Sequence, residues 1–446
     1  MSVQEGLDPV AAIAALEARL AATPRATRPH EHAAAAYRLG LARAESPVGD
    51  PADNLRQALD SYALAASIFD ARHDPMEHAR VLNAAAAAHR GLGRRRRAAD
   101  LFTQAAALFE AEGGDQERAA ALNNLGLTRA ELGERDAAIA AFDAAADLFD
   151  VGTADGRRGR ASTLHNRGQA QAAGGTAADL QAAIADHEEA KAAVEQDEAP
   201  YHHALVDHSL GVAASGLADV DPEGRAGHLR TAIDAFGSSL ATFTRAAFPY
   251  QHTLALHNLG RALAATGDLL DLRRALAYFE DAVAVLDPRL HAEPWRHAHA
   301  SLERAEAELA RRQGSPASRP LNFVILAASM ASSERIPLLR GRFKRLLGLP
   351  GPARDAAFAE LALASTTLEQ AVATGYITDE IIVLMEFPNE GLEAALSARM
   401  MAHRLLDGDI RLAADRALDA AVGDALGLSQ RLLVREHLAS LGFERP

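Results

Sequence analysis

The chain has 446 residues, of which 49% are apolar but only 5% are aromatic, and it carries a formal net charge of −14. The absence of cysteine excludes disulfides, thiolate metal ligands and cysteine nucleophiles. The negative charge disfavours general nucleic-acid binding. No apolar run reaches the roughly 18 residues of a membrane span, and the first residues lack the pattern of a signal peptide. We therefore expect a cytoplasmic protein.

The first predicted element is a helix over residues 8–23. Asp8 is a suitable cap, Pro9 suits the first turn, and apolar residues then recur at helical spacing. We expect this helix, within residues 1–28, to dock on the segment that follows.

A repeated frame follows, marked by a Leu-Gly pair in the first half of each unit. It occurs at Leu39-Gly40, Leu125-Gly126, Leu210-Gly211 and Leu259-Gly260, and Gly168 and Ala86 occupy the glycine position in two further units. Successive units are 40 to 49 residues apart. A period in this range is typical of stacked helix pairs.

The second half of each unit has a small residue, a large one four residues later, and another small one three residues after that. The large residues are Tyr62, Phe102, Phe142, His187, Phe236 and Phe279. Steps of four and three keep these positions on one helical face. Small residues in the first helix would let the second approach closely, so the large side chain can fill the space beside them.

This pattern resembles the tetratricopeptide repeat (TPR), most clearly at Asn124-Leu125-Gly126 with Phe142 and at Asn258-Leu259-Gly260 with Phe279. The units are longer than the usual repeat of this family. The resemblance implies an all-α, right-handed superhelical solenoid of about six helix pairs over residues 29–313. A helix over residues 295–313 would cap it.

The sequence GSPASRP at residues 314–320 predicts a linker, and the TPR frame is lost beyond it. We expect residues 321–446 to form a helical domain of unknown type. The predicted helices cover residues 322–333, 335–347, 355–374, 378–387, 390–406, 409–425 and 429–441. Residues 380–387 could instead be a buried strand, although a short buried helix is favoured.

The candidate site is a row of polar residues on the first helices, which line the concave groove in TPR proteins. A polar row is not needed for packing, so a ligand groove is one interpretation and a solvated face is the other. The predicted ligand-binding residues are Arg80, Asn83, Asn123, Asn124, His165, Asn166, His208, His257, Asn258 and Arg261.

Three further interpretations of this row can be weighed. A metal site needs ligands about 2.1 Å from one ion, whereas equivalent positions on neighbouring helices are about 10 Å apart, so no metal or cofactor is predicted. The histidines could make the groove sensitive to pH. The family's carboxylate clamp uses lysine, and here only Arg80, Arg90 and Arg261 could substitute for it.

Two basic stretches, residues 93–100 and 335–348, could bind an anionic partner or a membrane surface, but a solvated face opposite a packed one is the favoured interpretation. Phosphate-loop, zinc-protease and nucleophile-elbow motifs are absent. The sequence therefore favours a non-enzymatic regulator or scaffold that binds a protein or peptide, with the tail relaying or capping that binding. The alternatives are an enzyme with its site in the tail, around His403, Glu386 and Glu390, and a structural homo-oligomer.

Overall fold

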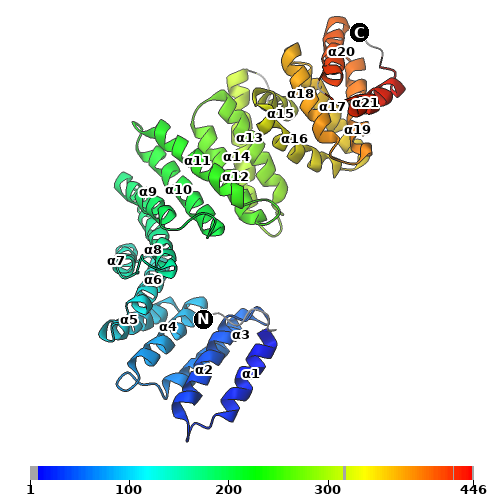
Figure 1. The fold of residues 1–446 in the computed structure, drawn as a ribbon. Helices are drawn as coiled ribbons and strands as arrows, with labels where there is room; N and C mark the ends of the chain where they lie inside the picture. The colour runs from blue at the N-terminus through cyan, green and yellow to red at the C-terminus, as the bar shows by residue number, and fades with distance from the viewer. Residues whose placement is uncertain (1–8, 315–317, 425, 444–446) are drawn as a thin grey trace. The chain divides into compact units, whose positions relative to one another are not determined.

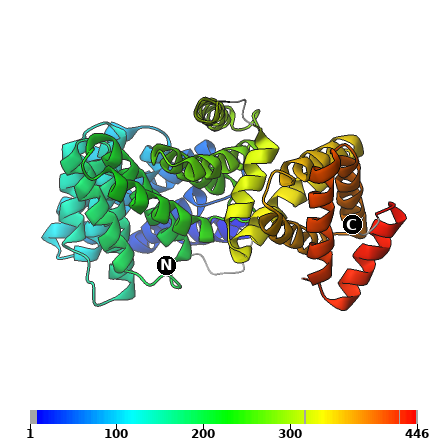
Figure 2. The ribbon, with the colours of Figure 1, turned by 90° about the horizontal axis from the view of Figure 1, so that it is seen from above.

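A computed structural model describes residues 9–314, 318–424 and 426–443, and over these residues the chain is entirely helical (Figures 1 and 2). It divides into an N-terminal unit, Met1–Ala262, and a C-terminal unit, Leu263–Pro446. The proposed cap Asp8, the centre of the predicted linker, and residues 425 and 444–446 lie outside the described residues. No described helix is long and apolar enough to cross a membrane.

The first twelve helices are α1 (Pro9–Ala22), α2 (Pro29–Ala44), α3 (Pro51–Ala66), α4 (Pro75–Gly91), α5 (Arg95–Ala111), α6 (Asp115–Glu131), α7 (Arg135–Ala146), α8 (Ala154–Ala172), α9 (Ala177–Ala192), α10 (Pro200–Val220), α11 (Arg225–Thr242) and α12 (Pro249–Ala265). The remaining helices are α13 (Leu269–Val285), α14 (Ala292–Gln313), α15 (Arg319–Ser329), α16 (Ser332–Leu347), α17 (Gly351–Ser365), α18 (Gln370–Leu384), α19 (Asn389–Arg404), α20 (Gly408–Asp424) and α21 (Leu428–Ser440).

In the N-terminal unit, α2 to α11 form five antiparallel pairs that stack in chain order, and α1 packs on α2 (Figure 1). The first helices of successive pairs also contact one another, from α2 through α4, α6 and α8 to α10. They therefore form one continuous layer. The predicted all-α fold with stacked pairs of the TPR type is confirmed.

In each pair, a buried ring on the second helix packs against a small residue on the first helix. A Cβ added to Gly126 would lie 2.5 Å from the Phe142 ring, and one added to Gly211 would lie 2.7 Å from the Phe236 ring. Tyr62, Phe102, Phe142, His187 and Phe236 are all at most 2% exposed. Because ordinary Cβ contacts do not come this close, only glycine fits at these two positions.

Four histidines near the start of first helices each bond to the end of the preceding helix. Each is the third residue after a proline, and its ring nitrogen donates to a carbonyl nine residues earlier. The bonds are His32 to Thr23 (2.7 Å), His78 to Phe69 (2.8 Å), His203 to Val194 (2.7 Å) and His252 to Phe243 (2.7 Å). These carbonyls lie at or just beyond helix ends, where intrahelical donors are missing.

The C-terminal unit contains helices from both sides of the predicted linker. Glu280 of α13 pairs with Arg342 of α16 at 2.5 Å, and Asp281 pairs with Arg345. Arg319 reaches back across the linker to Glu306 of α14. The domain boundaries at residues 29, 313 and 321 stay predictions, and the structural division lies between Ala262 and Leu263.

The helices after residue 331 follow a second frame that the sequence analysis missed. Helices α16, α18 and α20 begin at Ser332, Gln370 and Gly408, which are 38 residues apart. They pack side by side as one layer, and α15, α17 and α19 form another. Positions 38 residues apart are buried together, as in the sets Leu346, Leu384, Val422 and Phe358, Leu396, Val434.

One predicted helix boundary in this unit is wrong. The sequence placed a break at residues 375–377, but α17 ends at Ser365 and α18 runs from Gln370 through Gly375. The hydroxyls of Ser365, Thr366 and Thr367 each donate to the carbonyl three residues earlier. Such bonds compete with helical continuation. Residues 380–384, weighed as a strand, lie in α18.

The Phe142–Gly126 contact predicts a large loss of stability on truncation. Phe142 is fully buried, so Phe142→Ala should reduce the free energy of unfolding by about 3–5 kcal/mol. The control Gln104→Ala, at an exposed position on α5, should change it by less than about 0.5 kcal/mol. Urea titration followed by circular dichroism measures both. Equal transitions for Phe142→Ala and the native chain would contradict the repeat frame.

The histidine bonds predict a smaller effect. His78→Ala leaves the Phe69 carbonyl without its donor, so it should cost about 1 kcal/mol, the usual net value of one hydrogen bond. The exposed His297→Ala on α14 is the control and should be nearly neutral. The same urea titration applies, and a neutral His78→Ala would show that this bond does not hold the pairs together.

Candidate binding surface

The polar row predicted from the sequence lies on the layer of first helices, with Asn83 on α4, Asn123 on α6, His165 on α8 and His208 on α10. Asn258 continues it on α12, within the N-terminal unit. Asn83, Asn123, Asn124, Asn166, His208, His257 and Asn258 are all half-buried. The row therefore lies at the edge of the packed interface, neither fully solvated nor inside the core.

Side chains of this row bond across neighbouring helices. Asn166 Nδ2 donates to Asn123 Oδ1 at 3.1 Å, which joins α8 to α6. Asn258 Nδ2 lies 3.4 Å from His208 Nε2, which joins α12 to α10. The structure thus brings these four predicted residues together as two linked pairs along one surface.

Two residues that the sequence analysis missed extend the row. Gln169 Nε2 lies 3.2 Å from His165 Nε2 and 3.3 Å from Ser209 Oγ, which joins α8 to α10. Gln169 follows His165 by four residues, so the helical period places them on one face. That spacing was the available signal.

Part of the row retains unused hydrogen-bonding capacity. Asn83 Oδ1 and His208 Nδ1 are buried atoms without a hydrogen-bond partner among the described residues. Buried polar atoms without partners are uncommon because each costs free energy. A ligand would reach these two atoms only after their side chains rearrange, because both atoms are enclosed.

The exposure expected for His165 is not observed. Its side chain is 8% exposed, and its ring lies 5.3 Å from that of His187 and 6.0 Å from that of His202. Burial, reinforced by these two imidazoles, lowers the pKa of His165 to about 3. His165 therefore helps to fill the interface between α8, α9 and α10, because His187 is smaller than the phenylalanine found in other pairs.

The arginines considered for a carboxylate clamp are not equivalent. Arg80 on α4 donates to Glu117 Oε1 on α6 at 2.8 Å and also lies 3.8 Å from Glu77. Its charge is already neutralised by carboxylates of this chain. Arg261 on α12 is exposed. The geometry of the described residues thus gives no assembled clamp.

The titratable residues suggested for a catalytic site in the tail do not converge. His403 is buried, and its Nδ1 lies 2.7 Å from Asp415 Oδ1. Glu386 pairs with Arg340 at 2.5 Å, and Glu390 lies on the exposed first turn of α19. Without a shared cavity, these three side chains cannot act on one substrate.

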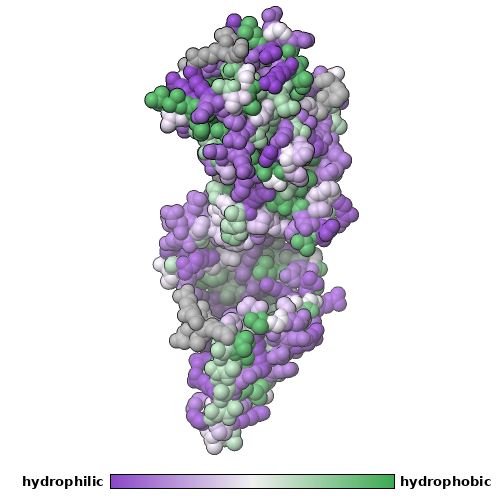
Figure 3. All heavy atoms as spheres, turned by 90° about the vertical axis from the view of Figure 1, so that its right-hand side faces the viewer, coloured by the Kyte–Doolittle hydropathy of each residue, from purple (hydrophilic) through white to green (hydrophobic). Residues whose placement is uncertain are grey.

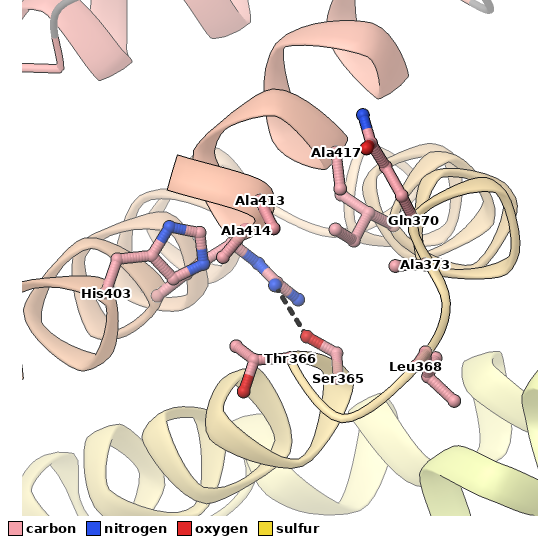
Figure 4. Close-up of a pocket in the computed structure, with 11 residues that line it drawn as sticks. Ser365, Thr366, Leu368, Gln370, Ala373, His403, Ala413, Ala414 and Ala417 are labelled. Atoms are coloured by element: carbon pink, nitrogen blue, oxygen red, sulfur yellow. Dashed lines mark hydrogen bonds between the residues drawn. The ribbon is translucent and has the colours of Figure 1, made fainter. Parts of the chain in front are cut away.

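The cavity beside His403 is also too small for a substrate (Figure 4). Its volume is about 30 Å³, and Arg399 crosses it to donate to Ser365 Oγ at 2.9 Å. Arg399 also pairs with the buried Glu380. A cavity of this size has room for only a few water molecules at most. Within the described residues, no group of three or more His, Asp or Glu could hold a metal ion.

A scan against protein-family models finds no match, and the search of curated proteins finds none either. Among solved structures, BtubC (BKLC) from P. vanneervenii is 20% identical over 55% of this chain and 93% of its own, with a TM-score of 0.41. A Rap protein complexed with Competence and Sporulation Factor is 13% identical, covering 70% and 90%, with a TM-score of 0.35. The TPR domain of P58(IPK) is 15% identical, covering 92% and 97%, with a TM-score of 0.27.

The buried imidazoles predict a specific pH dependence of stability. Burial lowers the pKa of His187 from its ordinary 6.5 to about 4, so between these values the unfolded chain binds more protons than the folded one. Stability is therefore lost as pH falls from about 6.5 to about 4. His187→Phe should remove up to about 1.4 kcal/mol per pH unit of this dependence.

Urea unfolding at about pH 7 and about pH 4.5 measures this difference. The reciprocal variant Phe142→His places an imidazole at the equivalent position of another pair and should steepen the pH dependence. If the free energy of unfolding varied with pH in the same way for the native chain and His187→Phe, the pH dependence could not be assigned to His187.

Proposed function

We propose that the N-terminal unit is a protein-interaction scaffold that binds an extended peptide segment of a partner along the polar row. The carrying observation is the continuity of this row across α6, α8, α10 and α12, shown by the Asn123–Asn166, Gln169–Ser209 and His208–Asn258 contacts. It supplies amide and imidazole groups that can both donate and accept hydrogen bonds. Those groups match the alternating donors and acceptors of a peptide backbone.

The spacing of the helices favours an extended ligand. Packed helices lie about 8–10 Å apart, and an extended chain rises about 3.3 Å per residue. About every third residue of such a ligand would therefore meet a new first helix. Because the helices are fixed by packing, the ligand bears most of the ordering entropy, and this preorganisation increases affinity.

The charges near the row affect which chemical groups of a ligand it can recognise. The carboxylates of Glu77 and Glu117 already neutralise Arg80, so an acidic chain terminus gains little at that place. Recognition through the peptide backbone and polar side chains is better supported than recognition of a free carboxylate. A relaying or capping role for the tail, a cytoplasmic location, regulation of a partner and self-association stay predictions.

Site-specific photo-crosslinking tests the location of the ligand. A benzophenone amino acid at position 124 should capture a partner in the native host, whereas the same group at exposed position 104 on α5 should not. Peptide mapping of the crosslink then identifies the bound segment. Equal capture at both positions would place the interaction outside the row.

The identified segment allows an affinity test. Asn83 and Asn124 make no side-chain hydrogen bond to the described residues, so Asn83→Ala with Asn124→Ala should barely change stability. Loss of two ligand bonds at about 1 kcal/mol each should weaken binding about 10-fold or more. The control, Gln104→Ala with Gln181→Ala, removes two exposed amides from second helices. Calorimetry that shows equal affinities for both double variants would refute the proposed site.

A further inference from the structure

A second surface lies in the C-terminal unit, between α17, α19 and α21. An open groove of about 560 Å³ runs here, lined by residues that include Asp355, Glu390, Glu393, Ser397, Met401 and His437. Helix α21 packs on α20, and Arg404 at the end of α19 donates to the Leu441 carbonyl at 2.6 Å. Helices α19 and α21 are therefore joined at one end, and the groove lies alongside them.

A comparison of positions 38 residues apart shows that this groove resembles a surface on which a further helix would pack. Met401 on α19 is 65% exposed, whereas its equivalent on α17, Leu363, is half-buried. Elsewhere on α21, outside the residues that line the groove, Leu433 is 42% exposed, whereas its equivalent Ala395 on α19 is 4% exposed. Positions that are covered in the preceding repeat are thus uncovered here, and they are apolar.

The other uncharged residues that α19 contributes to the groove are small. Ala394, Ser397 and Ala398 line the part of the groove that α19 contributes, and Leu405 is 79% exposed at the end of the same helix. In the space-filling view of Figure 3, apolar side chains interrupt the hydrophilic surface of the C-terminal unit. Small residues let a helix approach closely, and exposed large ones supply apolar area to bury.

The charge of the groove is predominantly negative. Glu390 and Glu393 are exposed and have no ion-pair partner among the described residues, whereas Asp355 is paired with the adjacent Arg354 at 2.9 Å. Two carboxylates one turn apart beside an apolar seat favour a ligand that carries Lys or Arg next to its apolar side chains.

We propose that this groove binds an amphipathic, basic α-helix of a protein partner. Its apolar face lies against Met401 and the small residues Ala394 and Ala398 beside it, and its basic residues meet Glu390 and Glu393. This binding mode requires apolar residues at helical spacing in the ligand. This proposal does not depend on the polar row of the N-terminal unit, so an experiment can refute either proposal without affecting the other.

The test uses the full chain and a fluorescein-labelled amphipathic helix of leucine and lysine, with its leucine–glutamate counterpart as the reference peptide. Fluorescence anisotropy should show saturable binding of the basic peptide and none of the acidic one. Glu390→Lys with Glu393→Lys should weaken binding about 10-fold, and Ser397→Trp should do the same by filling the groove without a change of charge.

The matched control is Glu360→Lys with Glu369→Lys, which alters the net charge equally at exposed positions outside the groove. It should change affinity less than about twofold. Equal weakening by the control, or undiminished binding by Ser397→Trp, would overturn the proposal in favour of nonspecific attraction. Sedimentation that shows a dimer disrupted by Ser397→Trp would instead assign the groove to a second copy of the chain.

Discussion

The close approach of the two helices in each pair is the contact on which the N-terminal unit depends. Gly126 admits the Phe142 ring to a distance that no Cβ could tolerate, and Gly211 does the same for Phe236. Each ring is then fully enclosed, although the chain contains few aromatics. Burial of one ring per pair provides apolar area that alanine-rich helices would otherwise lack, and stacking of the pairs completes the enclosure.

This packing also determines where polar groups can lie. The first helices contact one another in a single layer, so amides at the edge of that layer meet across helix boundaries, as Asn166 meets Asn123. In the pair of α8 and α9, the ring is an imidazole, His187, and His165 turns inward beside it. The same register therefore produces a half-buried polar surface in most pairs and a buried histidine cluster in one.

The C-terminal unit achieves a similar two-layer stacking by other means. Its frame of 38 residues relies on branched and aromatic residues, such as Leu384, Val422 and Phe358, and no glycine described in this unit has an aromatic ring as its nearest neighbour. It also buries charge, as in Arg399 with Glu380 and Arg335 with Asp379. Buried ion pairs require matched partners, which helps to fix one register among helices that are otherwise rich in interchangeable alanine and leucine.

The sequence by itself determined the helix pairs, because a small residue, a ring and a fixed spacing are all local in the chain. This periodicity predicted that Phe142 packs against Gly126 and that Asn123 lies on a first helix. Only the tertiary structure decided which polar residues are accessible, since the burial of His165 depends on His187 and His202 from two other helices. It likewise decided that Glu386 and Glu390 lie apart from His403 and that α21 leaves a groove beside α19. These outcomes depend on distances between helices, which a periodic pattern of residues in the sequence does not specify.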